Sequence, residues 1–160
     1  MLTVQRRVLT AKGIKSIVPY QHKFKNFYLF GSFSPITGNH FTIELPKCNG
    51  DCFQVYLDEF SKQNPDEFKI IFLDNGAFHK SKDLVKPDNL ELIFLPPYSP
   101  ELNPAEKMWR HLKDRIANVA HKTLDDLSDT VAQHIVDLTP ETIKSITSYD
   151  YYMENYNAVF

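Results

Sequence analysis

Two aromatic, strand-like segments separated by turn residues stand in the first third of the chain. Residues 26–34 read Asn-Phe-Tyr-Leu-Phe-Gly-Ser-Phe-Ser, and residues 40–45 return as a second apolar segment. Residues 35–39 lie between them and include Thr-Gly-Asn, a combination that supplies the tight turns of hairpins. The pattern predicts a β-hairpin over residues 26–45.

Residues 52–95 combine one helical pattern with two short apolar runs. Residues 68–73 and 90–95 are the two runs, and turn residues flank both. Their length predicts strands, and their continuous apolar character predicts that both faces are covered. Over residues 52–63 the apolar residues recur at mainly helical spacing. They are Phe53, Val55, Tyr56, Leu57 and Phe60.

Three helices are predicted for the rest of the chain. The first has Asn103 as its N-cap and Pro104 at its first helical position. The second begins at Thr123, and Asp126 three residues later completes a sequence similar to a capping box. The third begins at Thr139, directly before a proline. The expected apolar faces are Met108, Trp109, Leu112 and Ile116; Leu124, Leu127, Val131, Ile135 and Leu138; and Ile143 and Ile146.

This order of elements is typical of an α/β or α+β domain. A chain of 160 residues has the length of one domain, and 42% hydrophobic residues with 12 Phe and 8 Tyr suffice for a packed core. Within it we expect a basic arm and hairpin over residues 1–45, a helix–strand–strand–helix unit over residues 52–120, and C-terminal helices over residues 121–160.

Cysteine content and hydropathy exclude several classes of protein. Two cysteines argue against a disulfide framework, and without a secretory leader the expected compartment is the cytoplasm. No apolar run approaches the roughly 20 residues of a membrane span, so no membrane partner is expected. Cys48 and Cys52 lie near His40, but a structural zinc needs four ligands and usually a second close-spaced pair. We interpret the two cysteines as thiols.

Charge is distributed unevenly along the chain. Residues 1–43 contain six Lys or Arg and no acid, whereas the rest of the chain contains 12 basic and 20 acidic side chains. A basic arm beside an acidic site suits a DNA enzyme, because the arm neutralises phosphates while metal ions mask the carboxylates. A Lys-rich edge strand or a solvated helix face is the alternative. The candidate DNA contacts are Arg6, Arg7, Lys12, Lys107, Arg110 and Lys113.

Two acidic residues stand at positions that suit metal binding. Asp74 follows the apolar run of residues 70–73 directly, and Glu106 lies at the start of the helix after the second run. Two such acids on one rim can hold Mg²⁺ between a protein and a phosphodiester. Each also has a local alternative: Asp74 begins an Asp-Asn-Gly turn, and Glu106 is placed to cap the backbone N–H of Asn103.

The motif around these acids resembles the second half of a DDE transposase catalytic domain, in the bacterial insertion-sequence branch of the Tc/mariner superfamily. The resemblance is carried by Leu-Asp-Asn at residues 73–75, His79, the run Leu-Pro-Pro-Tyr-Ser-Pro-Glu-Leu-Asn-Pro-Ala-Glu at residues 95–106, and Trp109. It is dense over residues 70–113, weaker over residues 6–60, and has no motif after residue 120.

The resemblance implies an RNase H-like fold with three acids that bind two Mg²⁺ or Mn²⁺ ions. Asp74 matches the second acid and Glu106 the third, and the 31 residues between them fit a trimmed loop over residues 81–89. Asn75, His79 and Asn103 match positions close to the site. Asn75 would orient Asp74 or a metal-bound water, and His79 would contact phosphate or act in proton transfer. For Asn75 and His79, a polar loop that satisfies its own backbone is the alternative. Trp109 is expected in the core.

The first acid of the motif has no counterpart here. In the family it ends a strand upstream of a basic segment with a Lys-Gly pair, which Lys12-Gly13 resembles, and the first acidic residue of this chain is Glu44. The resemblance places that strand in the middle of the sheet, between the strands near Phe30 and Ile71. We therefore expect a gap in the sheet, filled by residues 2–9, by another chain, or not at all.

The expected function is that of a transposase catalytic-domain fragment, which cleaves and transfers DNA strands by metal-dependent phosphoryl transfer. Its partners would be double-stranded DNA, at transposon ends and target, and an upstream half of the transposase or a second chain. Lacking the first acid, this chain by itself is expected to be inactive. The alternatives are a non-catalytic remnant that binds DNA or a partner, and one half of a split transposase.

Overall fold

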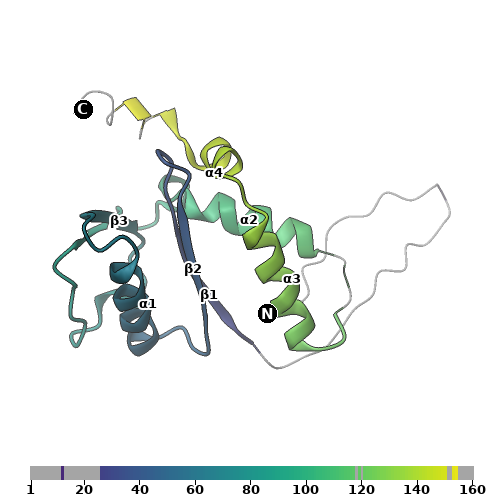
Figure 1. Ribbon diagram of the computed structural model, residues 1–160, viewed down its shortest axis with the longest axis horizontal. Helices are drawn as coiled ribbons and strands as arrows, with labels where there is room; N and C mark the ends of the chain where they lie inside the picture. Colours follow the sequence, from purple (N-terminus) through teal and green to yellow (C-terminus); the bar gives the residue numbers. More distant parts are fainter. Residues whose placement is uncertain (1–11, 13–25, 118, 120, 151–152, 155–160) are drawn as a thin grey trace.

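The computed structural model describes residues 12, 26–117, 119, 121–150 and 153–154. In this part of the chain the order is β1 (Tyr28–Phe33), β2 (His40–Leu45), α1 (Gly50–Lys62), β3 (Lys69–Leu73), η1 (Ala77–Lys80), β4 (Leu90–Phe94), η2 (Pro100–Leu102), α2 (Ala105–Ile116), α3 (Leu124–Val136) and α4 (Pro140–Thr147). Helix α1 lies on one side of the β1–β2 hairpin, and α2, α3 and α4 lie on the other (Figure 1). The predicted mixture of strands and helices is confirmed.

The hairpin forms as its sequence predicts. Strands β1 and β2 pair antiparallel, with Phe30 opposite Ile43 and Phe33 opposite His40. Its turn uses Gly38 at φ 78°, a conformation that side chains other than glycine rarely adopt. Alternation along β1 then divides its side chains between two helical layers: Phe30 packs against α1, and Phe33 packs against Trp109 of α2 with ring centroids 5.3 Å apart.

Helix α1 begins two residues earlier than the apolar spacing indicates. The Asn49 side chain accepts the backbone N–H of Cys52 at 3.1 Å and caps the helix, so Gly50 and Asp51 enter the first turn. The helix packs beneath both pairs of strands, because Phe53 and Leu57 share one buried cluster with Phe30 of β1 and Leu73 of β3. Both pairs of strands are therefore held by the same helix face.

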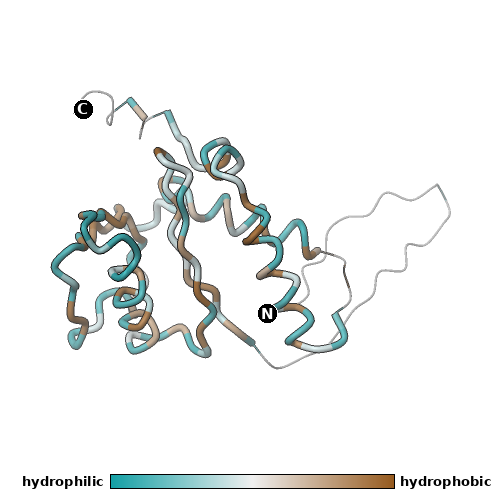
Figure 2. The backbone as a smooth tube through the Cα atoms, viewed as in Figure 1, coloured by the Kyte–Doolittle hydropathy of each residue, from teal (hydrophilic) through white to brown (hydrophobic). Residues whose placement is uncertain are grey.

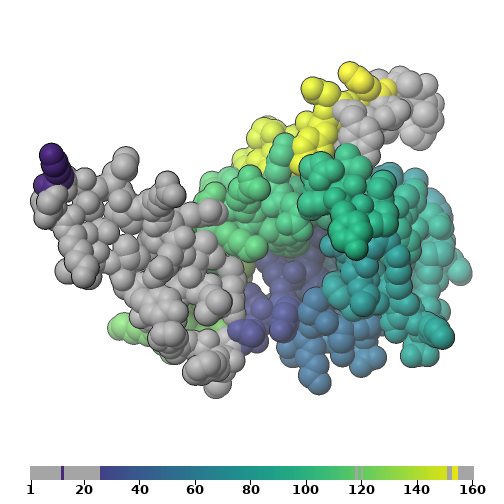
Figure 3. Space-filling model, turned by 180° about the vertical axis from the view of Figure 1, so that it is seen from behind, coloured from purple at the N-terminus to yellow at the C-terminus, as the bar shows by residue number. Residues whose placement is uncertain are grey.

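The strands form two separate two-stranded sheets within the described residues. Strand β3 pairs with β4 in parallel, from Lys69 opposite Leu90 to Leu73 opposite Phe94, and no ladder joins β3 to β1. In Figure 3 the indigo hairpin is set back between the blue α1 region and the green helices. Among the described residues, no strand pairs with both β1 and β3, the position of the expected gap between the strands near Phe30 and Ile71.

The expectation that β3 and β4 are covered on both faces is wrong. One face packs on α1, where Leu73 is 6% exposed and Leu90 is fully buried. The other face carries exposed hydrophobic side chains. Figure 2 shows the hydrophobic positions of the β3 region in brown. Continuous apolar runs do not reveal whether a second layer exists, because that layer comes from elsewhere in the fold. The exposed hydrophobic residues on this face are Ile70 and Phe72 of β3 and Ile93 of β4, and Phe68 just before β3 is exposed as well.

The three C-terminal helices build a second core on the far face of the hairpin. Met108 of α2 and Ile143 of α4 are fully buried there, and Phe33 of β1 packs against them. Helix α3 has the predicted capping box, in which Thr123 accepts the N–H of Asp126 and the Asp126 carboxylate accepts the N–H of Thr123. The predicted capping box and the predicted burial of Met108 and Ile143 are confirmed. They could be predicted because they depend on local spacing alone.

Candidate active site

Asp74 lies directly after β3 and is half-exposed, with 57% of its side chain accessible. Its Oδ1 accepts the backbone N–H of Gly76 at 2.9 Å, which closes the turn expected of Asp-Asn-Gly. The same oxygen lies 3.0 Å from Nδ1 of His79. Within the described residues Oδ2 has no hydrogen-bond partner. The carboxylate is thus fixed through one oxygen and open at the other, which combines the turn with a position suited to a cation.

His79 is placed behind Asp74 by aromatic packing. Its ring lies 4.6 Å from the Phe53 ring and 4.0 Å from the Phe78 ring, and 14% of the side chain is exposed. Burial lowers the pKa of His79 below its usual value, although hydrogen bonds and charge from Asp74 act in the opposite direction. A neutral imidazole then donates Nδ1–H to Asp74, so the ring contacts the candidate metal ligand rather than standing apart in the loop.

Asn75 joins the ends of the two parallel strands. Its Nδ2 donates to the backbone oxygen of Leu95, and its Oδ1 accepts from Lys80 Nζ. The Lys80 ammonium also lies over the Phe94 ring, 5.1 Å from the centroid. Asn75 thus ties the Asp74 turn to the segment that leads toward Glu106. Its expected role in orienting Asp74 or a water stays a prediction. Lys80 was missed by the sequence analysis, and its position after His79 was the available signal.

Asn75→Ala is expected to destabilise the fold by about 1–2 kcal/mol, because the carbonyl of the buried residue Leu95 loses its donor. The matched variant Lys80→Met keeps the aliphatic stem and the Asn75–Leu95 bond, and it should cost less than about 0.5 kcal/mol. Chemical denaturation measures both. Equal unfolding midpoints for Asn75→Ala and the parent chain would contradict this role.

Glu106 lies in the first turn of α2, and its side chain is exposed. The helix begins at Ala105, one residue later than predicted, and Pro104 is the flanking residue before it. The Asn103 side chain still accepts the N–H of Ala105 at 3.1 Å. The backbone N–H of Asn103 donates to Pro100 O, so Glu106 does not cap it as the alternative interpretation required. In the described chain its carboxylate has no hydrogen bond or ion pair.

Carboxylate oxygens at Asp74 and Glu106 fit the hard-cation chemistry of Mg²⁺ or Mn²⁺. A complete two-ion site needs more ligands than these two carboxylates. All 20 acidic residues of the chain lie among the described residues, and those residues contain no group of three or more His, Cys, Asp or Glu side chains able to hold a metal. The donor chemistry of Asp74 and Glu106 therefore suits a divalent ion, whereas the described residues do not assemble a two-ion site.

The candidate DNA contacts are only partly visible in the structure. Arg110 and Lys113 are exposed on α2, and the ion pairs of the described residues do not include them. Lys107 is exposed too, but its ammonium lies 3.9 Å from the centroid of the Tyr149 ring, which tethers it to the segment after α4. Lys12 is exposed, whereas Arg6 and Arg7 lie outside the described residues.

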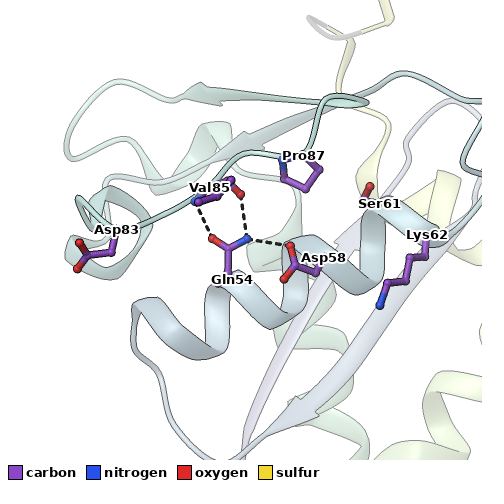
Figure 4. A pocket seen from close by; sticks show the side chains of 7 residues that line it. All are labelled: Gln54, Asp58, Ser61, Lys62, Asp83, Val85 and Pro87. Carbon is purple, nitrogen blue, oxygen red and sulfur yellow. Dashed lines mark hydrogen bonds between the residues drawn. The ribbon is translucent and has the colours of Figure 1, made fainter.

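The two cysteines and a hollow beside α1 do not contribute ligands to the candidate site. Cys48 and Cys52 are free thiols, the first exposed and the second buried. A shallow hollow between α1 and residues 83–87 is held by Gln54, which bonds the backbone N and O of Val85 at 2.8 and 2.9 Å (Figure 4). Neither Asp74 nor Glu106 lines it. Among the described residues, no helix has the length and apolar character of a membrane span.

Comparison with known proteins found a relative and a matching family model. An uncharacterized protein, y4pE/y4sA, of Sinorhizobium fredii (strain NBRC 101917 / NGR234) is 36% identical over 102 residues, which cover 62% of this chain and 76% of that protein. The family model described as DDE superfamily endonuclease matches residues 2–128, a span that includes β1 to α2 and both candidate acids. The chain belongs to the DDE superfamily endonuclease family.

Proposed function

We propose that this chain forms part of a transposase that cuts and joins DNA by metal-dependent phosphoryl transfer. The family has an RNase H-like fold and generally uses divalent metal ions. The observation that carries the proposal is the arrangement around Asp74: one carboxylate oxygen is fixed by Gly76 and His79, and the other is open. Through Asn75, the same turn is bonded to the segment that leads to Glu106.

Each residue has a distinct part in the proposed reaction. Asp74 and Glu106 would hold the divalent ion or ions, which when bound activate water or a DNA 3′-hydroxyl and stabilise the charge that develops on the phosphodiester. His79 orients the Asp74 carboxylate through Nδ1. Asn75 fixes the ends of β3 and β4 relative to each other, so that the two acids keep their separation when DNA binds.

The third carboxylate is supplied, in this proposal, from outside the 160 residues. Two observations support this. The described residues contain no group of three potential ligands although they include every acid of the chain, and β1 and β3 pack on the same helix without a ladder between them. A strand between β1 and β3 would bring its last residue to the same end of the sheet as Asp74 if it ran parallel to β3.

A non-catalytic role is the second candidate, and the absence of a three-ligand group in the described chain favours it. Such a remnant would bind DNA or a transposase chain through the same surfaces. It differs from the first proposal in one respect: an added strand with a carboxylate would confer no cleavage on it.

DNA binding tests the surface that the transposase and a DNA-binding remnant would both use. The double variant Arg110→Gln/Lys113→Gln should reduce the slope of log affinity against log salt by about 1.8, or about 0.9 for each phosphate that the variant no longer neutralises. The matched control is Lys62→Gln/Lys86→Gln, because these lysines pair with Glu59 and Glu91 at 2.6 and 2.8 Å. Fluorescence anisotropy with a labelled duplex at several salt concentrations measures the slopes. Equal slopes for the two double variants would contradict the assignment of this helix face.

A further inference from the structure

Tyr98 has a combination of features that core packing does not explain. Its relative exposure is 101%, so the ring touches almost nothing in the described chain. Its φ is 61°, the left-handed region that bulky residues seldom occupy. Burial of the ring does not compensate for this conformation. Residues held in such strained backbone conformations cluster at active sites and ligand-binding positions.

The backbone on both sides holds Tyr98 in place. Before it, the N–H of Leu95 donates to Leu73 O at 2.9 Å, and Leu95 O accepts from Asn75. After it, the N–H of Leu102 donates to Ser99 O at 3.1 Å and begins the short η2 turn. Prolines at 96, 97 and 100 restrict the intervening chain further. The phenol ring is therefore presented on a constrained turn.

The turn lies beside the candidate site. Tyr98 lies three positions after Leu95, a span of at most roughly 11 Å, and Leu95 is bonded to the residues on both sides of Asp74. Continuing along the chain, α2 begins seven residues after Tyr98 and carries Glu106 in its first turn, with the exposed cations Arg110 and Lys113 beyond it. A ligand that reaches both acids thus passes close to the ring.

The geometry points to Tyr98 as a stacking platform for an unpaired nucleobase of DNA bound at the Asp74–Glu106 site. This inference rests on the proposed function, which supplies the DNA. Base faces stack on exposed tyrosine rings without regard to sequence, and an unpaired base at the end of a duplex has a free face to offer. A protein contact is the alternative; the exposed cations on the adjoining helix favour a polyanionic ligand.

The test uses the 160-residue chain and two DNA probes: a blunt duplex, and the same duplex with a short overhang that carries 2-aminopurine. The parent chain and Tyr98→Phe should quench the fluorophore and bind the overhang more tightly than the blunt end. Tyr98→Ala and Tyr98→Gly should bind the overhang on the order of 10-fold more weakly, with blunt-end affinity unchanged. Tyr98→Gly should melt no lower than the parent, because glycine adopts φ near 61° readily.

The other outcomes distinguish a ring without a stacking role, a ring that contacts protein, and a chain that does not bind DNA. Equal overhang affinity and quenching in the parent chain and Tyr98→Ala would overturn the stacking role while leaving the proposed function intact. Loss of self-association in Tyr98→Ala, measured by sedimentation, with DNA binding unchanged would assign the ring to a protein contact instead. If the parent chain binds neither probe, the proposed function fails and the stacking role fails with it.

Discussion

The 160-residue chain by itself is expected to cleave plasmid DNA at least about 10³-fold more slowly than the same chain supplied with a strand that ends in aspartate, in Mg²⁺ or Mn²⁺. Two carboxylates can hold one ion, whereas two-ion phosphoryl transfer requires ligands for both. The described residues include all 20 acids of the chain and no group of three ligands. The measurement is plasmid nicking, with and without the strand peptide.

Two matched variants make this assay specific. With the peptide present, Asp74→Asn should abolish nicking, because it removes a ligand charge at constant shape. A peptide that ends in asparagine should bind and give no activity. Robust metal-dependent nicking by the chain alone, lost in Asp74→Ala, would show that the chain needs no outside carboxylate.

The same strand peptide is expected to stabilise the fold. Any ligand of the native state adds stability by mass action, about 2.7 kcal/mol at 100 times its dissociation constant. For a chain of this size that corresponds to a rise in melting temperature of roughly 5–10 °C. The physical reason is the sheet. Within the described residues, β1 and β3 both pack on α1 but lie in separate sheets, and a strand that pairs with both would join them through backbone hydrogen bonds. Thermal melts measure the shift.

The control for this prediction is the same peptide with a proline at its centre. Proline has no backbone N–H, so this peptide cannot complete the hydrogen bonds of a central strand. It should give no shift. The absence of any shift with the extended peptide at saturation would mean that the space between β1 and β3 is already taken by another segment or by a second copy of the chain. A self-contained, non-catalytic remnant would then be the better account.

Features that depend on local spacing could be predicted from the sequence. The capping box of Thr123 and Asp126 and the buried stripe of Met108 and Leu112 follow from positions three and four residues apart. The acids Asp74 and Glu106 were found because a motif places both at the ends of elements. The family follows from this motif, while the metal roles of the two residues stay predictions.

Features that depend on tertiary partners could not be predicted. The exposed face of Ile70 and Phe72 has the same apolar sequence as a covered one, so the missing layer left no local signal. Asn75 bonds Leu95, 20 residues away, a pairing that needs the parallel register of β3 and β4. The φ of Tyr98 likewise arises from the bonds on both sides of its turn.

The most direct test of the central claim, that Asp74 and Glu106 bind the divalent ion, is a Mn²⁺ titration followed by amide NMR. Binding should be weak, since two carboxylates offer few ligands and such ions give up water reluctantly. The paramagnetic ion should broaden the amide signals of Asp74, Asn75 and Glu106 first, and Asp74→Asn should remove the effect. If these three signals stay sharp while signals of other acidic residues broaden, the site lies elsewhere and the account is wrong.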